Sequence, residues 1–432
     1  MQAVPFKRHA ILWKAELRNA ALYTLQSTGG AFASPLMLGG LVPAIIVRLG
    51  GSDLLIGLVS TLANAVGVPS LLLAAYVGVR TRRKGVASLV WNLVNWWVYL
   101  PALLVLLLSG RSPSLTAFVA AIMAAVVMAA LSGSVASVIQ VDLLSRIITP
   151  ERRGRVTGIA GAMSGASGLA GGVLLSLLLA RLAFPKGYGI ASVVGLIIGS
   201  LPLIMFLAYR ELPGLKTSAG ARLPGLLHSL QVIRGDRRFL RVLAAAMLKY
   251  VFNAATIFVV PVALRRHGLP DTFVGHFAIL TSIVTIGVGP LGGWSADRWG
   301  ISRTAFIGGI VAAIGISLYP HAVSYAFVLA SSAVIVAGST LIGTMFFLAP
   351  MHLSPPEHRS AYIAMRYLAE SVAGVLCTPL VGYAIMVWNP AYVFYVAAAA
   401  AVASGSLLVR ATGWYCRPQE KQGTPRESPV GT

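Results

Sequence analysis

Long apolar runs divide this chain, and its basic residues lie almost entirely in alternate gaps between these runs. Only 11% of the residues are charged, whereas soluble domains carry about a quarter. A membrane-spanning helix needs about 20 apolar residues, and it satisfies its own backbone polar groups because hydrocarbon offers no partners. The runs are too long and continuous for barrel strands, which alternate apolar and polar residues over about 10 positions. The pattern therefore predicts an all-α integral membrane protein.

The apolar runs predict twelve transmembrane helices, arranged as two bundles of six. The longest polar interval of the membrane part separates the two groups. We expect a cytoplasmic N-terminus at 1–18, a first six-helix bundle at 19–209, a cytoplasmic central loop at 210–238, a second six-helix bundle at 239–410 and a disordered cytoplasmic tail at 411–432. The twelve expected spans are 19–47, 54–78, 86–108, 114–138, 156–180, 187–209, 239–264, 272–295, 303–320, 325–350, 360–386 and 390–410.

The basic residues are divided unevenly between the two sides that this topology defines. The side with both termini receives 26 of the 34 Lys and Arg residues, the other side receives 6, and 2 lie inside spans. Cytoplasmic loops carry an excess of Lys and Arg, so we expect both termini in the cytoplasm and the protein in the cell membrane. The net charge of +22 then reflects topology and contact with anionic lipids, and no nucleic-acid partner is expected.

The chain also lacks several other sequence signals. Its two cysteines, Cys377 and Cys416, provide no disulfide framework and no metal cluster. The first apolar run is too long for the core of a cleavable signal peptide. No nucleophile elbow, paired carboxylates or phosphate-binding loop occurs, so we expect neither an enzyme nor a cofactor.

The two groups of spans resemble each other in sequence. Asp-Leu-Leu-Ile-Gly at 53–57 opens the second span, and Asp-Thr-Phe-Val-Gly at 271–275 opens the eighth. Pro-Glu-Arg-Arg at 150–153 precedes the fifth span, and Pro-Glu-His-Arg at 356–359 leads into the eleventh. Parallel halves related by an axis along the membrane normal are a known plan of secondary transporters.

The segment at 293–300, Gly-Trp-Ser-Ala-Asp-Arg-Trp-Gly, fits the loop signature G-x-x-x-D-R-x-G. With twelve spans and a basic central loop, it makes the chain resemble the major facilitator superfamily over about 15–410. The resemblance implies two six-helix bundles around a central site, with spans 1, 4, 7 and 10 lining the cavity. It also implies a gating loop that contains Asp297 and Arg298, with Arg82 and Arg83 at the equivalent place in the first half.

The chain departs from the family pattern at two places. Gly78 stands where the first-half loop of many members has an acid that helps to lock the halves on the cytoplasmic side. Any such lock must be built differently here. Ser-Gly at 167–168 replaces the Gly-Pro of an element that drug exporters often carry in the fifth span.

Small and amide residues predict contacts between the spans. Side-chain amides at membrane depth, such as Asn64, often hydrogen-bond between helices. The fifth span has two glycine pairs with a spacing of four, and we expect them to form a close-packed seam where the halves rock. These glycines are Gly161, Gly165, Gly168 and Gly172.

Three charged residues lie well inside the expected spans: Lys249, Arg366 and Glu370. A charge at the bilayer centre costs ~2.5–3.5 kcal/mol on insertion scales, so each needs a partner or a water-filled cavity. Arg366 and Glu370 are four residues apart and share one helix face. Counting along the helices puts Lys249 and Glu370 at a similar depth. We expect Arg366 and Glu370 to couple transport to a proton or another cation; a static ion pair is the alternative.

The expected substrate site includes Gln26, Lys249, Tyr250 and Asn253. Alignment of the first and seventh spans places Gln26 opposite Lys249 across the central cavity. A Gln facing a Lys suits a ligand with acceptor oxygens, and Tyr250 and Asn253 are expected in the same wall. The alternative is that Lys249 only neutralises Glu370.

Together these features predict a secondary active transporter that moves a small organic solute across the cytoplasmic membrane by alternating access and is coupled to protons. We expect a monomer. A drug or metabolite exporter of the same fold is the first alternative, and it would need an apolar, aromatic cavity with Lys249 paired off. A transporter-like receptor or a lipid-flipping membrane protein is the alternative from another class.

Overall fold

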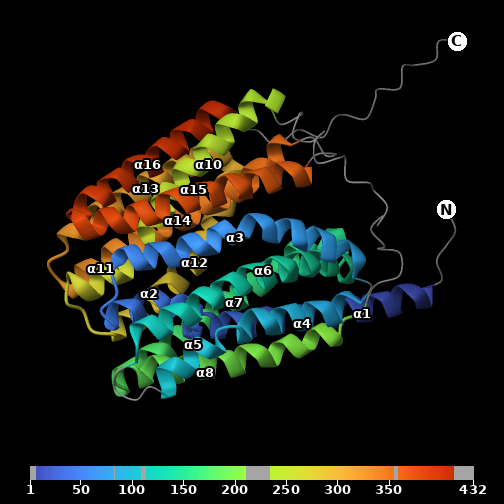
Figure 1. The fold of residues 1–432 in the computed structure, drawn as a ribbon. Coiled ribbons are helices and arrows are strands. Elements are labelled where there is room, and N and C mark those ends of the chain that lie inside the picture. Colours follow the sequence, from blue (N-terminus) through green and yellow to red (C-terminus); the bar gives the residue numbers. More distant parts are fainter. Residues whose placement is uncertain (1–5, 82, 109–112, 211–233, 355–358, 413–432) are drawn as a thin grey trace, which may run out of the picture.

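The computed structural model describes residues 6–81, 83–108, 113–210, 234–354 and 359–412. In these residues the chain forms two helical bundles, which we call the N-terminal half (α1 to α8) and the C-terminal half (α10 to α16) (Figure 1). Eleven segments of the described residues are long and apolar enough to cross a membrane, and α3 adds a shorter apolar helix at Asp53–Gly67. The all-α membrane fold expected from sequence is confirmed. Most of the expected central loop and tail falls outside the described residues.

Serine and aspartate side chains start several of the helices. Ser52 accepts a hydrogen bond from the Leu55 backbone at the start of α3, and Ser114 and Ser324 do the same for α6 and α14. The N-terminal half consists of α1 (Phe6–Ala33), η1 (Ser34–Leu36), α2 (Leu38–Arg48), α3 (Asp53–Arg80), α4 (Lys84–Trp97), α5 (Leu100–Leu108), α6 (Leu115–Ile147), α7 (Pro150–Arg181), α8 (Lys186–Ser200) and η2 (Leu201–Leu207).

The C-terminal half begins after Asp236, whose carboxylate accepts hydrogen bonds from the backbone of Arg238 and Phe239 at 3.0 Å. It consists of α10 (Arg237–Thr256), α11 (Val259–Arg265), α12 (Thr272–Trp299), α13 (Ile301–Leu318), η3 (Tyr319–His321), α14 (Tyr325–Leu353), α15 (Arg359–Val387) and α16 (Pro390–Thr412).

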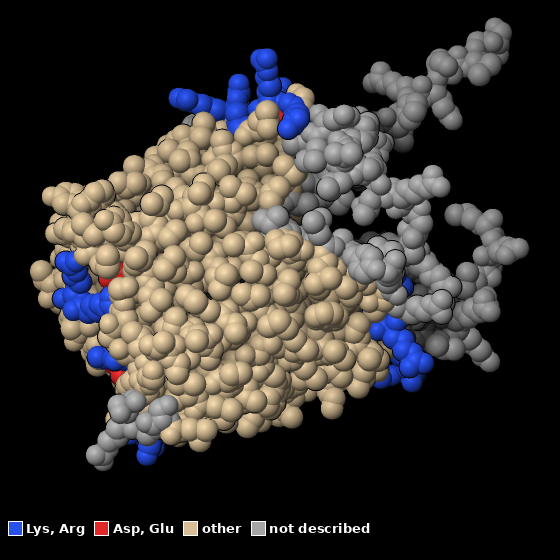
Figure 2. Space-filling view, viewed as in Figure 1, with Lys and Arg blue, Asp and Glu red and all other residues tan. Residues whose placement is uncertain are grey.

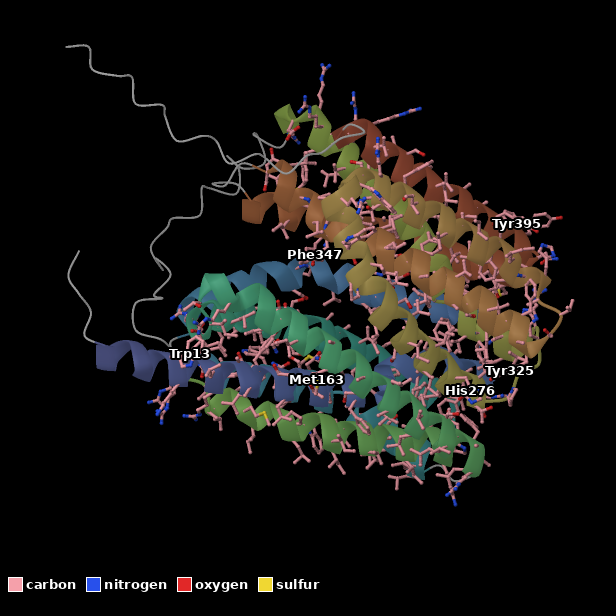
Figure 3. The ribbon with its side chains drawn as sticks, turned by 180° about the vertical axis from the view of Figure 1, so that it is seen from behind. Trp13, Met163, His276, Tyr325, Phe347 and Tyr395 are labelled. Carbon is pink, nitrogen blue, oxygen red and sulfur yellow. The ribbon has the colours of Figure 1, made fainter. Side chains whose placement is uncertain are left out.

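The molecule has two polar ends. We call the end where α1 begins and α16 ends the terminal face, and the opposite end, where α2 and α11 end, the distal face (Figure 1). On the side shown in Figure 2, Lys and Arg side chains lie near the two ends, and a broad band between them is free of charge. Figure 3 shows Trp13 near the terminal face and His276, Tyr325 and Tyr395 near the distal face. This distribution fits a molecule that spans a bilayer.

The two halves meet where helices from each cross closely. Helix α3 packs against α15, and α7 packs against α12. Glycines allow the close approach: a Cβ at Gly57 would lie 2.8 Å from the Thr378 carbonyl oxygen, and one at Gly275 would lie 2.5 Å from the Ser176 Cα. Gly57 and Gly275 end the two similar segments that open the second and eighth spans. The sequence repeat therefore contributes one glycine to each crossing.

The expected glycine seam in α7 lies against α12. A Cβ at Gly165 would meet Ile286, one at Gly168 would meet Ser282, and one at Gly172 would meet the Ile279 backbone. Gly161 has open space around its Cβ position. Three of the four glycines thus form the contact between the halves.

The first and seventh spans are interrupted, as is the third, between α4 and α5. The first breaks at η1 and Met37, whose backbone is extended (φ −68°, ψ 135°). The seventh breaks at Ile257 and Phe258, between α10 and α11. Irregular backbone at membrane depth is tolerated where protein surrounds it or where it lines a cavity. The breaks therefore mark the region in which to look for a site.

We predict that Gly275→Ala lowers the thermal unfolding midpoint of the purified protein. The added methyl group would overlap the Ser176 backbone, and overpacking typically costs about 1–3 kcal/mol. Gly287→Ala on the same helix is the matched control, because nothing lies within 4 Å of its Cβ position. An equal or higher midpoint for Gly275→Ala than for the control would contradict the close crossing.

Candidate functional site

An ion triad of Lys249, Arg366 and Glu370 lies inside the C-terminal half. Lys249 Nζ is 2.9 Å from Glu370 Oε1, and Arg366 Nη1 is 2.8 Å from the same oxygen. Lys249 is on α10, and the other two are one turn apart on α15. These contacts agree with the shared helix face of Arg366 and Glu370 and with the similar depth of Lys249 and Glu370 that we expect from the sequence.

The triad is buried and carries two cations for one carboxylate. Lys249 and Arg366 are only 6% and 4% exposed. The Arg366 guanidinium lies 4.0 Å from the centre of the Tyr367 ring, and Lys249 Nζ lies 5.5 Å from that of Phe346. Aromatic faces attract cations, which partly offsets the second positive charge. The carboxylate is therefore the one group that holds both cations within the triad.

A polar contact joins the two halves close to the triad. Tyr250, which follows Lys249 in α10, donates a hydrogen bond from its hydroxyl to Asn64 Oδ1 of α3 at 3.0 Å. The Asn64 amide donates in turn to the Ser60 carbonyl at 2.9 Å. A Cβ at Gly374, one turn beyond Glu370, would lie 2.5 Å from Asn64 Cγ. The helix that carries Glu370 therefore packs directly on the N-terminal half.

The other expected substrate residues make hydrogen bonds with groups outside the triad. Gln26 Oε1 accepts a 3.5 Å hydrogen bond from Tyr209, and it lines a small space within the N-terminal half beside Tyr23 and Gln140. The structure does not bring Gln26 and Lys249 together as a pair. The Asn253 carbonyl accepts a hydrogen bond from Thr256 at 2.7 Å.

The residues of the expected gating loop are only partly described. Arg82 and the Asp297 side chain lie outside the described part of the structure. Arg83 is exposed at the start of α4, and the Arg298 guanidinium lies 5.4 Å from the centre of the Trp294 ring. Gly300, the last residue of the loop signature, has φ of +88°, a conformation that favours glycine.

Two reciprocal ion pairs join the halves at the distal face. Arg48 Nε of the N-terminal half lies 2.5 Å from Asp271 Oδ1 of the C-terminal half. Arg265 Nη1 of the C-terminal half lies 2.7 Å from Asp53 Oδ1 of the N-terminal half. The two aspartates are the equivalent residues of the sequence repeat, so each half supplies one acid and one base. We call these residues the distal latch.

Further hydrogen bonds position the distal latch. The Tyr188 hydroxyl donates to Asp271 Oδ1 at 2.9 Å, and the Arg265 guanidinium donates to the Gly51 carbonyl. The pairs are partly exposed, with side-chain exposures of 33% and 21% for Arg48 and Asp271. The latch is not among the predictions from the sequence, where Arg48 and Arg265 are only two of the six basic residues on the less basic side. The repeated aspartate was the available signal.

A cavity of about 650 Å³ lies between the halves, on the terminal side of the distal latch. Leu41, Val260 and Val274 line it, one or two turns from latch residues on α2, α11 and α12. The breaks of the first and seventh spans, at Ser34 and Ile257, also line it. Gln26, Lys249, Tyr250 and Asn253 are not among its lining residues. None of the three triad residues lines this cavity.

These features define a polytopic membrane protein built from two similar bundles around a central cavity. The sequence profile of the Major Facilitator Superfamily matches residues 24–376, and the chain belongs to this superfamily. The resemblance seen in the sequence is thereby confirmed, and the protein is a membrane transporter rather than an enzyme. No curated protein sequence matches the chain significantly.

Solved structures of transporters share this fold at low sequence identity. A variant of the nucleoside transporter NupG is 12% identical, with a TM-score of 0.71 over 91% of this chain and 99% of that chain. A D-xylose-proton symporter is 14% identical, with a TM-score of 0.68 over 90% and 96%. The xylose transporter XylE from E. coli, in an inward open conformation, is 14% identical, with a TM-score of 0.67 over 95% and 98%. At these identities the likeness concerns the fold.

We predict that Glu370→Gln lowers the thermal unfolding midpoint more than Lys249→Gln does. Glu370→Gln leaves two buried cations without a countercharge, and breaking a buried ion pair costs about 3–5 kcal/mol. Lys249→Gln keeps the Arg366–Glu370 pair. The midpoints of both purified variants, measured at one pH, give the order. The reverse order would show that the carboxylate does not hold the triad together.

Proposed function

We propose that this protein is a secondary active transporter that moves a small organic solute across the cell membrane by alternating access. The superfamily and the two-bundle fold support transport. The excess of basic residues in the loops on the side of the termini supports a cytoplasmic terminal face. The distal face is then the outer side of the membrane, and anionic lipids of the cytoplasmic leaflet contact the basic loops. We expect the transporter to act as a monomer.

The observation that carries this proposal is the distal latch above the cavity. Both of its ion pairs cross from one half to the other, so moving the halves apart at this face breaks both. Exposed or partly exposed ion pairs are typically worth about 0.2–1 kcal/mol each. Two such pairs can hold the outer side closed and still open in each cycle. The described conformation is the outward-closed state of this cycle.

The ion triad is the proposed coupling site. Both ion pairs use Glu370 Oε1, and a proton bound to this carboxylate would remove the negative charge on which the pairs with Lys249 and Arg366 depend. Glu370 faces these two cations from α10 and α15, while α3 presents the uncharged Asn64 near Gly374. Breaking the triad would change how α15 packs against α3. Protonation could in this way be transmitted to the interface between the halves.

The end of α12, which carries the loop signature, is the proposed gate on the cytoplasmic side. Asp297 and Arg298 of its signature, with Arg82 and Arg83 in the equivalent loop of the first half, would form it. Gly78 occupies the place of the acid in the first-half loop. We therefore propose that the acid of this gate comes from the C-terminal half alone.

An exporter of drugs or metabolites is the second candidate. Its requirements were an apolar, aromatic cavity and a Lys249 that is paired off, and Phe277 is the one aromatic residue among the described residues that line the 650 Å³ cavity. Lys249 is paired with Glu370, and the cavity is lined mainly by apolar side chains, including Phe277. These two observations favour an apolar compound over an acidic one as the solute.

We predict that Asp53→Asn with Asp271→Asn opens the outer side. The reporter is the Leu41→Cys thiol in the cavity wall, in a protein whose Cys377 and Cys416 are replaced by Ala. A membrane-impermeant maleimide added outside oriented proteoliposomes should label it several times faster when both latch acids are neutralised. Labelling rates are read by mass spectrometry.

The matched control is Glu16→Gln, which removes a carboxylate paired with Arg152 at 3.0 Å within the N-terminal half. This variant should label at the rate of the parent. Unchanged labelling of the double latch variant would contradict alternating access through this face.

We also predict that the labelling rate of the Leu41→Cys thiol, divided by that of the same thiol in the unfolded protein at each pH, depends on pH and that Glu370→Gln removes this dependence. The division is needed because the thiolate is the reactive form and its fraction rises with pH in any variant. Protonation of Glu370 breaks the triad in the parent, whereas Gln carries no titrating proton. Rates are compared across a pH series at a temperature below the unfolding midpoint of each protein. A pH dependence that survives in Glu370→Gln and is lost in Glu16→Gln would assign coupling elsewhere.

A further inference from the structure

The cavity beneath the distal latch has the size and position of a substrate site. Its volume is about 650 Å³, and it adjoins a space of about 390 Å³ in the N-terminal half and one of about 310 Å³ in the C-terminal half. Pro43 and Ser60 are shared with the first space, and Thr256, Phe277 and Thr281 with the second. Drug-sized ligands occupy pockets of about 300–1,000 Å³. The combined space extends into both halves, so a bound solute would contact both.

None of the described residues that line these three spaces carries an ionisable acid or base, apart from the phenol of Tyr99. The polar groups are hydroxyls of Ser and Thr and the amide of Asn95. An anion would find no Lys, Arg or His there, and an organic cation would find no carboxylate. Burying a charge without a partner costs several kcal/mol, so the lining disfavours both.

Several of the hydroxyls already donate their proton within their own helix. Thr256 donates to the Asn253 carbonyl at 2.7 Å, Thr281 to the Phe277 carbonyl at 2.8 Å and Ser282 to the Ala278 carbonyl at 3.0 Å. These oxygens offer a ligand acceptor lone pairs rather than donors. A carboxylate or phosphate, which needs donors, is therefore poorly matched to them.

The nearest charged groups that the structure places around the cavity are engaged elsewhere. The arginines of the distal latch are bound to Asp53 and Asp271, and Lys249 is bound to Glu370. The broken first and seventh spans contribute Ser34 and Ile257 to the wall. Interrupted helices at the interface of the repeats are where transporters place their substrate. The site thus offers apolar walls and a few neutral polar groups.

We infer that this cavity binds an uncharged, largely apolar organic solute, an inference that rests on the proposed transport function. Apolar contact supplies the affinity, and the hydroxyls and broken helix ends supply a few hydrogen bonds to neutral donors of the ligand. The ion triad lies outside this cavity. Substrate selection and ion coupling therefore use different residues.

The test is equilibrium binding of three naphthalene probes to the protein in nanodiscs. N-phenylnaphthylamine is uncharged, anilinonaphthalene sulfonate is an anion, and trimethylnaphthylammonium is a cation. Empty nanodiscs are measured in parallel and subtracted. We expect saturable binding of the uncharged probe and at least about tenfold weaker binding of both ions, which corresponds to about 1.4 kcal/mol.

Variants at Thr281 assign the binding to this cavity. Thr281→Phe fills the space shared by two of the three volumes and should abolish saturable binding of the uncharged probe. Ile283→Phe is the matched control, because Ile283 lies two residues away on α12 with 54% of its surface exposed. Thr281→Asp should reverse the preference, strengthening the cation relative to the uncharged probe.

Ion binding equal to or tighter than that of the uncharged probe would overturn the inference, as would full binding in both Thr281 variants. The result is independent of the labelling test of alternating access. Binding as expected without opening of the distal latch would refute the transport cycle and keep the cavity chemistry. Opening of the latch together with preferred binding of an ion would refute only the inference that the cavity selects an uncharged solute.

Discussion

The distal latch connects the two halves through two ion pairs, in each of which one half supplies the acid and the other half supplies the base. Arg48 reaches Asp271, and Arg265 reaches Asp53, at 2.5 and 2.7 Å. The arrangement follows from an internal repeat, since the two aspartates open equivalent spans. Because both pairs are partly exposed, each is worth about 0.2–1 kcal/mol, far less than the core packing of either bundle. In the proposed cycle, the latch would be strong enough to bias one conformation and weak enough to be broken in each turnover.

The buried triad has the opposite energetic character. Lys249, Arg366 and Glu370 lie within one half, and removing the carboxylate would leave two cations with no countercharge inside the protein. In the proposed coupling, the triad stays intact within the C-terminal half until its charge changes. Its helix α15 packs on α3, and glycines keep that contact close. This direct packing is the route by which the proposed charge change in the triad would affect a movement between the halves.

Much of the fold follows from the sequence because membrane helices must be long, apolar and internally hydrogen-bonded. The spacing of four between Arg366 and Glu370 placed both on one face, where the structure has them. Pairs such as Arg48 with Asp271 join residues far apart in the chain, so no local pattern shows them. The rotation of each helix about its axis cannot be predicted from the sequence either, because a mostly apolar span does not specify which side faces the cavity. Gln26, for example, accepts a hydrogen bond from Tyr209 within its own half. The apolar lining of the cavity depends on that rotation.

The most direct test of the account is the distance between spin labels across the distal face, measured by pulsed electron paramagnetic resonance in nanodiscs. Lys186 at the start of α8 and Val323, which is 94% exposed in the other half, are suitable label sites. We expect a short distance in the parent protein and a second, longer population that grows when Asp53 and Asp271 are both replaced by Asn. A single distance that the latch variants leave unchanged would contradict it.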